Sequence, residues 1–102
     1  MFELLKKVFA KKEQINAKEM LLNGALLIDV RSPREFSEWH AKQAKNIPLN
    51  RIHENITYFK RVNKPILLCC ASGVRSAQAR YILNSNNITD VHDAGSCKKF
   101  IN

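Results

Sequence analysis

The stretch that decides the fold is Ile66-Leu67-Leu68-Cys69-Cys70-Ala71-Ser72-Gly73-Val74-Arg75-Ser76-Ala77-Gln78-Ala79-Arg80. It predicts a buried strand that ends at Cys70, a tight turn from Cys70 to Arg75, and a helix that begins at Arg75 or Ser76. Gly73 lets the backbone bend where a Cβ would obstruct. Backbone amides, the start of the helix and a guanidinium would then surround the Cys70 sulfur, and all three favour a thiolate over a thiol. The stretch therefore predicts a nucleophilic sulfur.

Length and composition limit the remaining possibilities. A chain of 102 residues, 45% hydrophobic and 25% charged, suits one globular domain with a single core. Three cysteines, two of them adjacent, do not make a disulfide framework and fit a reducing compartment better. The start of the chain does not read as a signal peptide, and no apolar run is long enough to span a bilayer. These features predict a cytoplasmic protein with no membrane role.

The net charge of +8 needs a separate interpretation. The basic residues are scattered along the chain, and aromatic residues do not interleave with them as they do in single-strand binding surfaces. We therefore expect no nucleic-acid partner, and a surface that attracts small anions. Residues 1–12 form a separate basic segment with helical spacing of its apolar residues. We expect this segment to pack on the domain of residues 13–102 rather than to attach to a membrane.

Helix and strand signals alternate along the chain. Asn16 and Ser32 each stand three residues before a glutamate, which is the spacing of a capping box at a helix start. Gly24 is placed to end the first of these helices. The predicted strands cover residues 25–30, 46–49, 66–70 and 89–92, and a further helix is predicted over residues 51–59.

This alternation predicts an α/β domain with a mostly parallel central sheet of about five short strands and helices on both faces. Ligands of such sheets bind beyond the carboxyl ends of the strands. Asp29 and Cys70 stand at two predicted strand ends, so we expect them to share one edge of the sheet.

Two segments together resemble the rhodanese family of single-domain sulfurtransferases. Residues 70–76, Cys-Ala-Ser-Gly-Val-Arg-Ser, match its active-site pattern C-x-x-G-x-R-S, and residues 29–36 match its upstream pattern D-V-R-x-x-x-E-[FY]. Residues 39–48 are similar to the segment that follows in the family, although Trp39 and Gln43 replace glycines. The resemblance runs from about Ile15 to the end of the chain, and it implies a rhodanese-like fold.

The resemblance also implies a function. Cys70 would attack the outer sulfur of a small anionic donor such as thiosulfate and carry it as a persulfide to cyanide or a thiol. No metal or cofactor is implied. The substrate-binding loop would consist of Ala71, Ser72, Gly73, Val74, Arg75 and Ser76. Asp29 and Arg31 would support that loop as a structural network.

Two alternatives use the same cysteine. The first is a cysteine-dependent phosphatase, which needs the longer pattern C-x5-R to wrap a phosphate. Here four residues separate Cys70 from Arg75, so we expect a loop that fits one sulfur atom. The second is a non-enzymatic carrier that receives a persulfide from a protein partner in a sulfur relay and passes it on.

The remaining cysteines and histidines predict little chemistry. Cys69 alternates to the opposite face from Cys70, where a small core residue is expected. Cys97 could serve as a relay thiol, but we expect no role for it. The three histidines do not have the spacing of a metal site.

Overall fold

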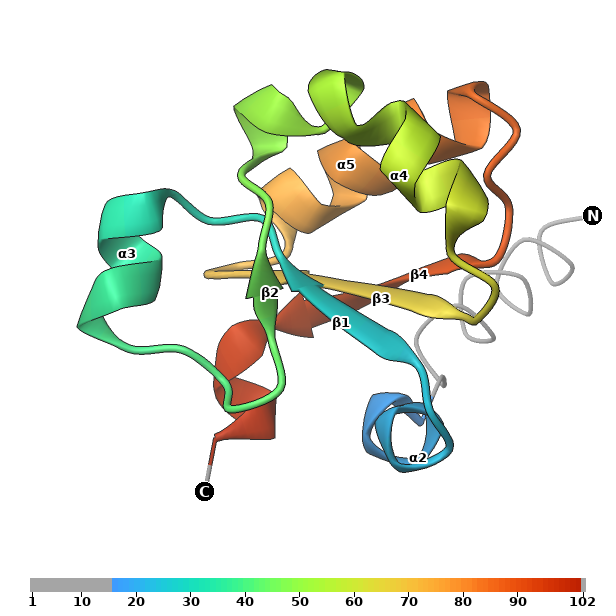
Figure 1. Cartoon of the computed structure of the whole chain (residues 1–102). Coiled ribbons are helices and arrows are strands. Elements are labelled where there is room, and N and C mark those ends of the chain that lie inside the picture. Colours follow the sequence, from blue (N-terminus) through green and yellow to red (C-terminus); the bar gives the residue numbers. More distant parts are fainter. Residues whose placement is uncertain (1–15, 102) are drawn as a thin grey trace, which may run out of the picture.

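Four parallel strands form the sheet in the computed structural model, which describes residues 16–101 (Figure 1). Their order is β2-β1-β3-β4, and neighbouring strands are parallel throughout. The strands are β1 (Leu26–Asp29), β2 (Lys45–Asn46), β3 (Ile66–Cys70) and β4 (Val91–Ser96). The α-helices are α2 (Ala17–Leu22), α3 (Pro33–Glu38), α4 (Ile56–Arg61) and α5 (Val74–Ser85). The predicted α/β class is confirmed, with four strands in the described residues where about five were expected.

The two predicted helix starts are present. The Asn16 side chain accepts a hydrogen bond from the backbone N–H of Glu19 at 3.0 Å. At α3 the box is reciprocal, because Ser32 Oγ accepts from Glu35 N–H and a Glu35 carboxylate oxygen accepts from Ser32 N–H. Gly24 follows α2 with φ +101°, a conformation that glycine adopts without strain.

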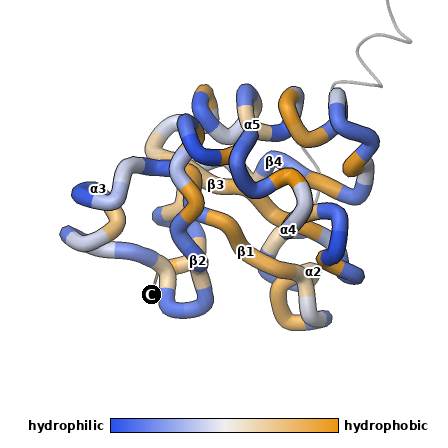
Figure 2. The backbone as a smooth tube through the Cα atoms, turned by 45° about the horizontal axis from the view of Figure 1, so that its top comes forward, coloured by the Kyte–Doolittle hydropathy of each residue, from blue (hydrophilic) through white to orange (hydrophobic). Residues whose placement is uncertain are grey.

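The central strands are apolar because helices cover the sheet on both faces (Figures 1 and 2). Helices α4 and α5 cover one face, where Ile28, Leu68 and Leu83 belong to one buried cluster. The other face packs against α2 and a C-terminal 3₁₀ turn, η3 (Cys97–Phe100). Alternate residues of β3 therefore point into different cores, and Cys70 lies in the α4/α5 core while Cys69 lies in the other.

Residues 49–55 differ from the predicted helix over 51–59. They form two 3₁₀ turns, η1 (Leu49–Arg51) and η2 (His53–Asn55), before α4 begins at Ile56. Asn55 donates its backbone N–H to Ile52, three residues back, and its side-chain amide to the Arg51 carbonyl. The side chain thus occupies the acceptor that an α-helical N–H would use.

The last strand is longer than predicted and lies later in the chain. It runs through Gly95 to Ser96, and its register against β3 shifts between Leu68 and Cys69. The sequence pattern places Gly95 beyond the strand, but this residue, with φ +75°, sits inside a bulge and the pairing continues past it. As a result Asp93 and Ser96 reach the carboxyl end of the sheet.

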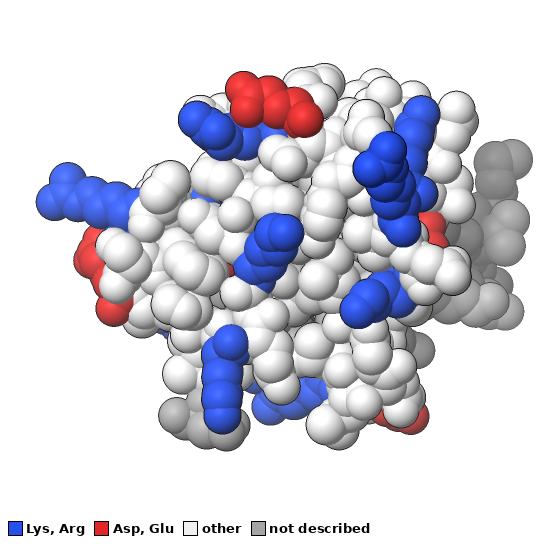
Figure 3. All heavy atoms as spheres, viewed as in Figure 1, with Lys and Arg blue, Asp and Glu red and all other residues white. Residues whose placement is uncertain are grey.

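Two of the predictions concern the basic residues of the chain. The basic segment of residues 1–12 lies outside the described residues. Figure 3 shows lysine and arginine side chains spread over the visible face instead of gathered in one patch. Within residues 16–101, no helix has the length and apolar character needed to cross a membrane.

Candidate active site

Cys70 is the last residue of β3 and is fully buried at the edge where the strands end. Its sulfur accepts hydrogen bonds from the backbone N–H of Gly73 at 2.9 Å and of Ser76 at 3.4 Å. Gly73 has φ +98° and serves as the N-cap of α5, so the chain turns back over the sulfur. Helix α5 begins at Val74, slightly earlier than predicted. Of the ring of amides expected from the sequence, those of Gly73 and Ser76 donate to the Cys70 sulfur.

Opposing effects set the pKa of the Cys70 thiol. Burial is the largest and raises the pKa, because a thiolate is poorly solvated there. The Ser76 hydroxyl and the amides of Ser76, Gly73 and Ser72 lower the pKa by hydrogen bonding to the charged sulfur. Together they outweigh burial, and the net pKa lies below the ordinary value of 9.0. The hydrogen bonds of the loop thus shift Cys70 toward the thiolate, which is the reactive form of a nucleophilic cysteine.

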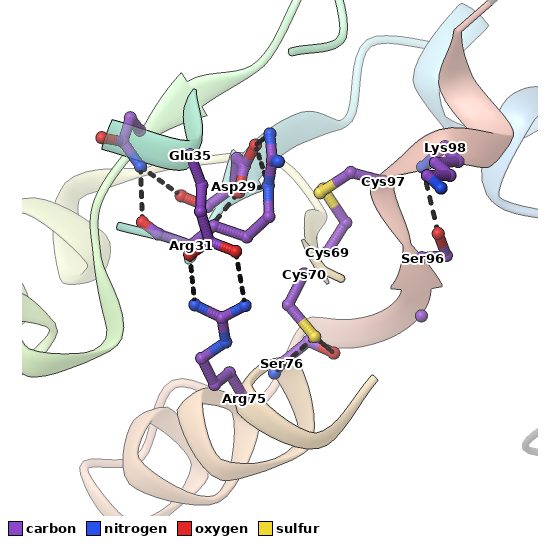
Figure 4. The surroundings of a disulfide bond; sticks show 12 residues. Asp29, Arg31, Glu35, Cys69, Cys70, Arg75, Ser76, Ser96, Cys97 and Lys98 are labelled. Carbon is purple, nitrogen blue, oxygen red and sulfur yellow. Dashed lines mark hydrogen bonds and ion pairs between the residues drawn. A yellow bond between two sulfur atoms is a disulfide. The ribbon is translucent and has the colours of Figure 1, made fainter. Parts of the chain in front are cut away.

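Arg75 does not point into the loop. Its guanidinium donates two hydrogen bonds to the Glu35 carboxylate, at 2.6 and 3.0 Å, and Figure 4 shows the two side chains face to face. The Arg75 hydrogen bond is the main reason that the pKa of Glu35 falls from 4.5 to about 2. Glu35 also caps α3, so one carboxylate ties that helix to the start of α5.

Comparison with known proteins places this loop in a family. Residues 11–100 match the family model of the rhodanese-like domain. The chain belongs to the rhodanese-like family. It is 38% identical over 72 residues to the thiosulfate sulfurtransferase PspE of Escherichia coli, a match that covers 70% of this chain and 69% of that protein.

The chain is also similar to a second curated protein and to a solved structure. An uncharacterised protein of Bacillus subtilis, YqhL, is 39% identical over 77 residues, which cover 74% of this chain and 60% of YqhL. The chain therefore spans less than two thirds of that relative. An E. coli structure described as a rhodanese with anions superposes with a TM-score of 0.68 at 34% identity, covering 76% of this chain and 93% of that one.

Asp29 and Arg31 form a buried pair in this rhodanese-like domain. Arg31 donates from Nε and Nη2 to the Asp29 carboxylate, with a shortest distance of 2.7 Å, and both side chains are almost fully buried. Arg31 also donates to the Trp39 carbonyl at 2.7 Å, and its guanidinium lies 3.9 Å from the centre of the Trp39 ring. Asp29 ends β1 beside Cys69, so it shares the sheet edge with Cys70 as expected. The pair holds the segment after α3.

The expectation for Cys69 and Cys97 is wrong. They form a disulfide that joins β3 to η3, and both are fully buried (Figure 4). Cys69 does belong to the core opposite Cys70, but as a bonded residue and not as a free thiol. Cys70 is the one free cysteine among the three of the chain. The disulfide also removes the reason to infer a reducing compartment from the cysteine count.

The same region includes a candidate metal-binding group in the described residues. One ligand atom each from Asp29, Cys69 and Cys97 lies within 4.8 Å of the others. Both sulfurs are already bonded to each other, and the Asp29 carboxylate is taken by Arg31. The arrangement does not fit a metal ion.

A hollow of about 300 Å³ opens beside the loop. The side chains around it come from the loop, from α3 and the residues on either side of that helix, and from η3. They are Arg31, Glu35, Glu38, Trp39, Ala71 and Lys98. Trp39 lines this hollow and also packs against the core between the sheet, α2 and η3.

Two residues at the site were not anticipated from the sequence. The capping box places Glu35 at the start of a helix, yet this residue also holds Arg75, 40 residues along the chain. Asp93 received no role, yet it accepts a hydrogen bond from Ser76 Oγ at 2.7 Å. The capping box that begins at Ser32 is a local sequence signal that Glu35 has a structural role. For Asp93 no local signal existed, because its position depends on the bulge at Gly95.

Proposed function

We propose that this protein is a sulfurtransferase that carries sulfane sulfur as a persulfide on Cys70. The observation that supports this most is the cradle of the Cys70 sulfur, which accepts from two backbone amides at the end of β3. Such amides stabilise a sulfur anion without a base, because they meet the charge with fixed dipoles. Relatives named as thiosulfate sulfurtransferases agree with this chemistry.

The reaction proceeds in two displacements. The Cys70 thiolate attacks the outer sulfur of thiosulfate, a new S–S bond forms, and sulfite leaves with the electron pair of the broken bond. The acceptor then attacks the terminal sulfur of the persulfide. With cyanide the product is thiocyanate, and Cys70 departs as the thiolate that began the cycle. No proton has to be moved by an additional side chain.

The pair of Glu35 and Arg75 holds the loop without a hydrogen bond to the Cys70 sulfur. Glu35 fixes Arg75, while the exposed side chains of Ala71, Ser72 and Val74 form the outer rim of the loop. An arginine engaged in this way is not free to clamp a phosphate from both sides. This contact and the loop length both favour sulfur transfer over phosphate hydrolysis.

We expect the donor to be a small anion and the acceptor a thiol or cyanide. Lys98 borders the hollow beside the loop, and the net charge of +8 attracts anions from a distance. Cys70 itself is fully buried. A donor therefore reaches the sulfur only when the rim of the loop moves. The cytoplasmic location and the absence of nucleic-acid partners remain predictions.

Turnover with thiosulfate and cyanide tests the proposal directly. Thiocyanate should form with the wild-type protein and fall to the uncatalysed rate with Cys70→Ser. The double variant Cys69→Ala/Cys97→Ala is the matched control, since it removes the other two sulfurs and leaves the loop sequence intact. Thiocyanate formation that persists in Cys70→Ser would refute the proposed role of Cys70.

The carrier function predicts a different result in the same samples. Mass spectrometry would show one added sulfur atom on Cys70 after incubation with thiosulfate, without turnover. Transfer would then require a protein partner of a sulfur relay. A protein that neither turns over nor gains sulfur would exclude both functions.

A further inference from the structure

The Ser76 hydroxyl has more acceptors around it than protons to give. Its oxygen lies 3.4 Å from the Cys70 sulfur, 3.1 Å from the Gly73 carbonyl oxygen and 2.7 Å from the Asp93 Oδ1. A hydroxyl has one proton and donates one strong hydrogen bond. Whichever group receives that proton leaves the others without it.

Geometry and charge both favour Asp93 as the receiver. A distance of 2.7 Å is typical of a hydroxyl that donates to a carboxylate, and such bonds are about twice as strong as neutral ones. The sulfur lies farther away, at 3.4 Å. Asp93 is itself held in place, because the same oxygen accepts the backbone N–H of Gly95 at 2.9 Å.

We propose that Asp93 is a positioning residue that draws the Ser76 proton away from Cys70 and so makes the cysteine harder to ionise. When Ser76 donates to Asp93, its oxygen can only accept from Cys70, and it then stabilises the thiol. The same hydroxyl is the leading cause that lowers the pKa of Cys70 when it donates to the sulfur. Asp93 therefore competes for the bond on which the thiolate most depends.

Other charged groups around Cys70 are paired or more remote. Arg75 of α5 is bound to Glu35 of α3, and Asp29 of β1 is bound to Arg31. On the side of α5, Asp93 shares a solvent-open hollow of about 290 Å³ with Arg80. At the C-terminal turn, Lys98 borders the other hollow, and Lys99 Nζ lies near Gly95. Within the described residues, Asp93 is the only one of these charged groups that is hydrogen-bonded to Ser76 Oγ.

This role rests on the proposed function and deepens it, because the ionisation of Cys70 affects both displacements. Loading needs a thiolate on Cys70, whereas unloading needs the Cys70 sulfur to be a good leaving group. A lower thiol pKa increases the thiolate fraction and improves the leaving group. Removing the Asp93 charge should therefore favour both steps when the pH lies below the wild-type pKa of the Cys70 thiol. Above that pH the sulfur is already ionised, and the change only makes it less nucleophilic.

Direct titration of Cys70 tests the proposal without any turnover. The chain has a single free thiol, so ultraviolet absorbance of the thiolate and the pH dependence of iodoacetamide alkylation both report on Cys70. We expect Asp93→Asn to shift the midpoint down by about one pH unit, since a neutral amide oxygen competes less strongly than a carboxylate for the Ser76 proton and the thiolate then receives that hydrogen bond. The asparagine side chain is isosteric with aspartate and its carbonyl oxygen can still accept from Gly95, so we expect the fold to persist. Asp93→Ser is the second variant if the first fails to fold.

Two control experiments separate the effect of the Ser76–Asp93 hydrogen bond from the effect of the Asp93 charge alone. Asp90→Asn removes the same charge from an exposed residue that contacts His92, and it should leave the midpoint unchanged. In a Ser76→Ala background the effect of Asp93→Asn should shrink to less than about half. An unshifted or raised midpoint in Asp93→Asn, or an equal shift in both backgrounds, would overturn the proposal. Because the titration involves no sulfur donor, failure of the proposed function leaves this result unaffected.

Discussion

Replacing Glu35 by glutamine tests how firmly α3 is tied to the active loop. The glutamine can still cap α3, but it loses the charge that holds Arg75. A fall of the Glu35 pKa from 4.5 to about 2 would correspond to roughly 3 kcal/mol of stability. The two side chains are 35% and 34% exposed, so water screens the pair. We therefore expect Glu35→Gln to lower the free energy of unfolding by about 1 kcal/mol at neutral pH.

The pH dependence gives this prediction its sign. A carboxylate with a depressed pKa stabilises the fold above its unfolded pKa, and that contribution disappears as pH falls toward about 2. Urea unfolding of both proteins across this range should show curves that converge in acid. Glu38→Gln, an exposed residue of the same helix, is the control and should show no such convergence. A Glu35→Gln deficit that stays constant with pH would refute the ion pair as its source.

Two further predictions concern the disulfide and the loop glycine. The Cys69–Cys97 bond closes a separation of 28 residues, so a reductant should lower the free energy of unfolding by about 3 kcal/mol, measured in urea. A Cys69→Ala/Cys97→Ala variant should be insensitive to reductant, and reductant sensitivity in that variant would contradict the assignment. Gly73→Ala and Gly24→Ala, at φ +98° and +101°, should each cost about 1 kcal/mol, because neither site has a close steric obstacle. Only Gly73→Ala should slow alkylation of Cys70, and an equal slowing by Gly24→Ala would contradict the role of the turn.

Local signals in the sequence were sufficient for the elements that carry the site. The apolar run at 66–70 and the glycine at 73 predicted the strand, the turn and the helix, because each depends on neighbouring residues. The capping box at Ser32 predicted α3 for the same reason. The 3₁₀ turns before α4 were missed because the Asn55 side chain, and not the apolar spacing, decides the hydrogen bonding there.

Contacts between distant residues could not be predicted in this way. Glu35 and Arg75 are 40 residues apart, and the Cys69–Cys97 pairing depends on where η3 meets β3. Asp93 reaches Ser76 only because β4 continues through the bulge at Gly95. Such contacts follow from the sheet register, which no short pattern in the chain specifies.

The disulfide also affects how long a loaded sulfur can be kept. A persulfide near a free thiol is short-lived, because the thiol attacks it, releases sulfide and leaves a disulfide behind. Here both other cysteines are already bonded to each other and buried. The persulfide proposed for Cys70 thus has no thiol in its own chain to consume it. Its lifetime is set by the arrival of an outside acceptor, which lets the protein hold its cargo between encounters.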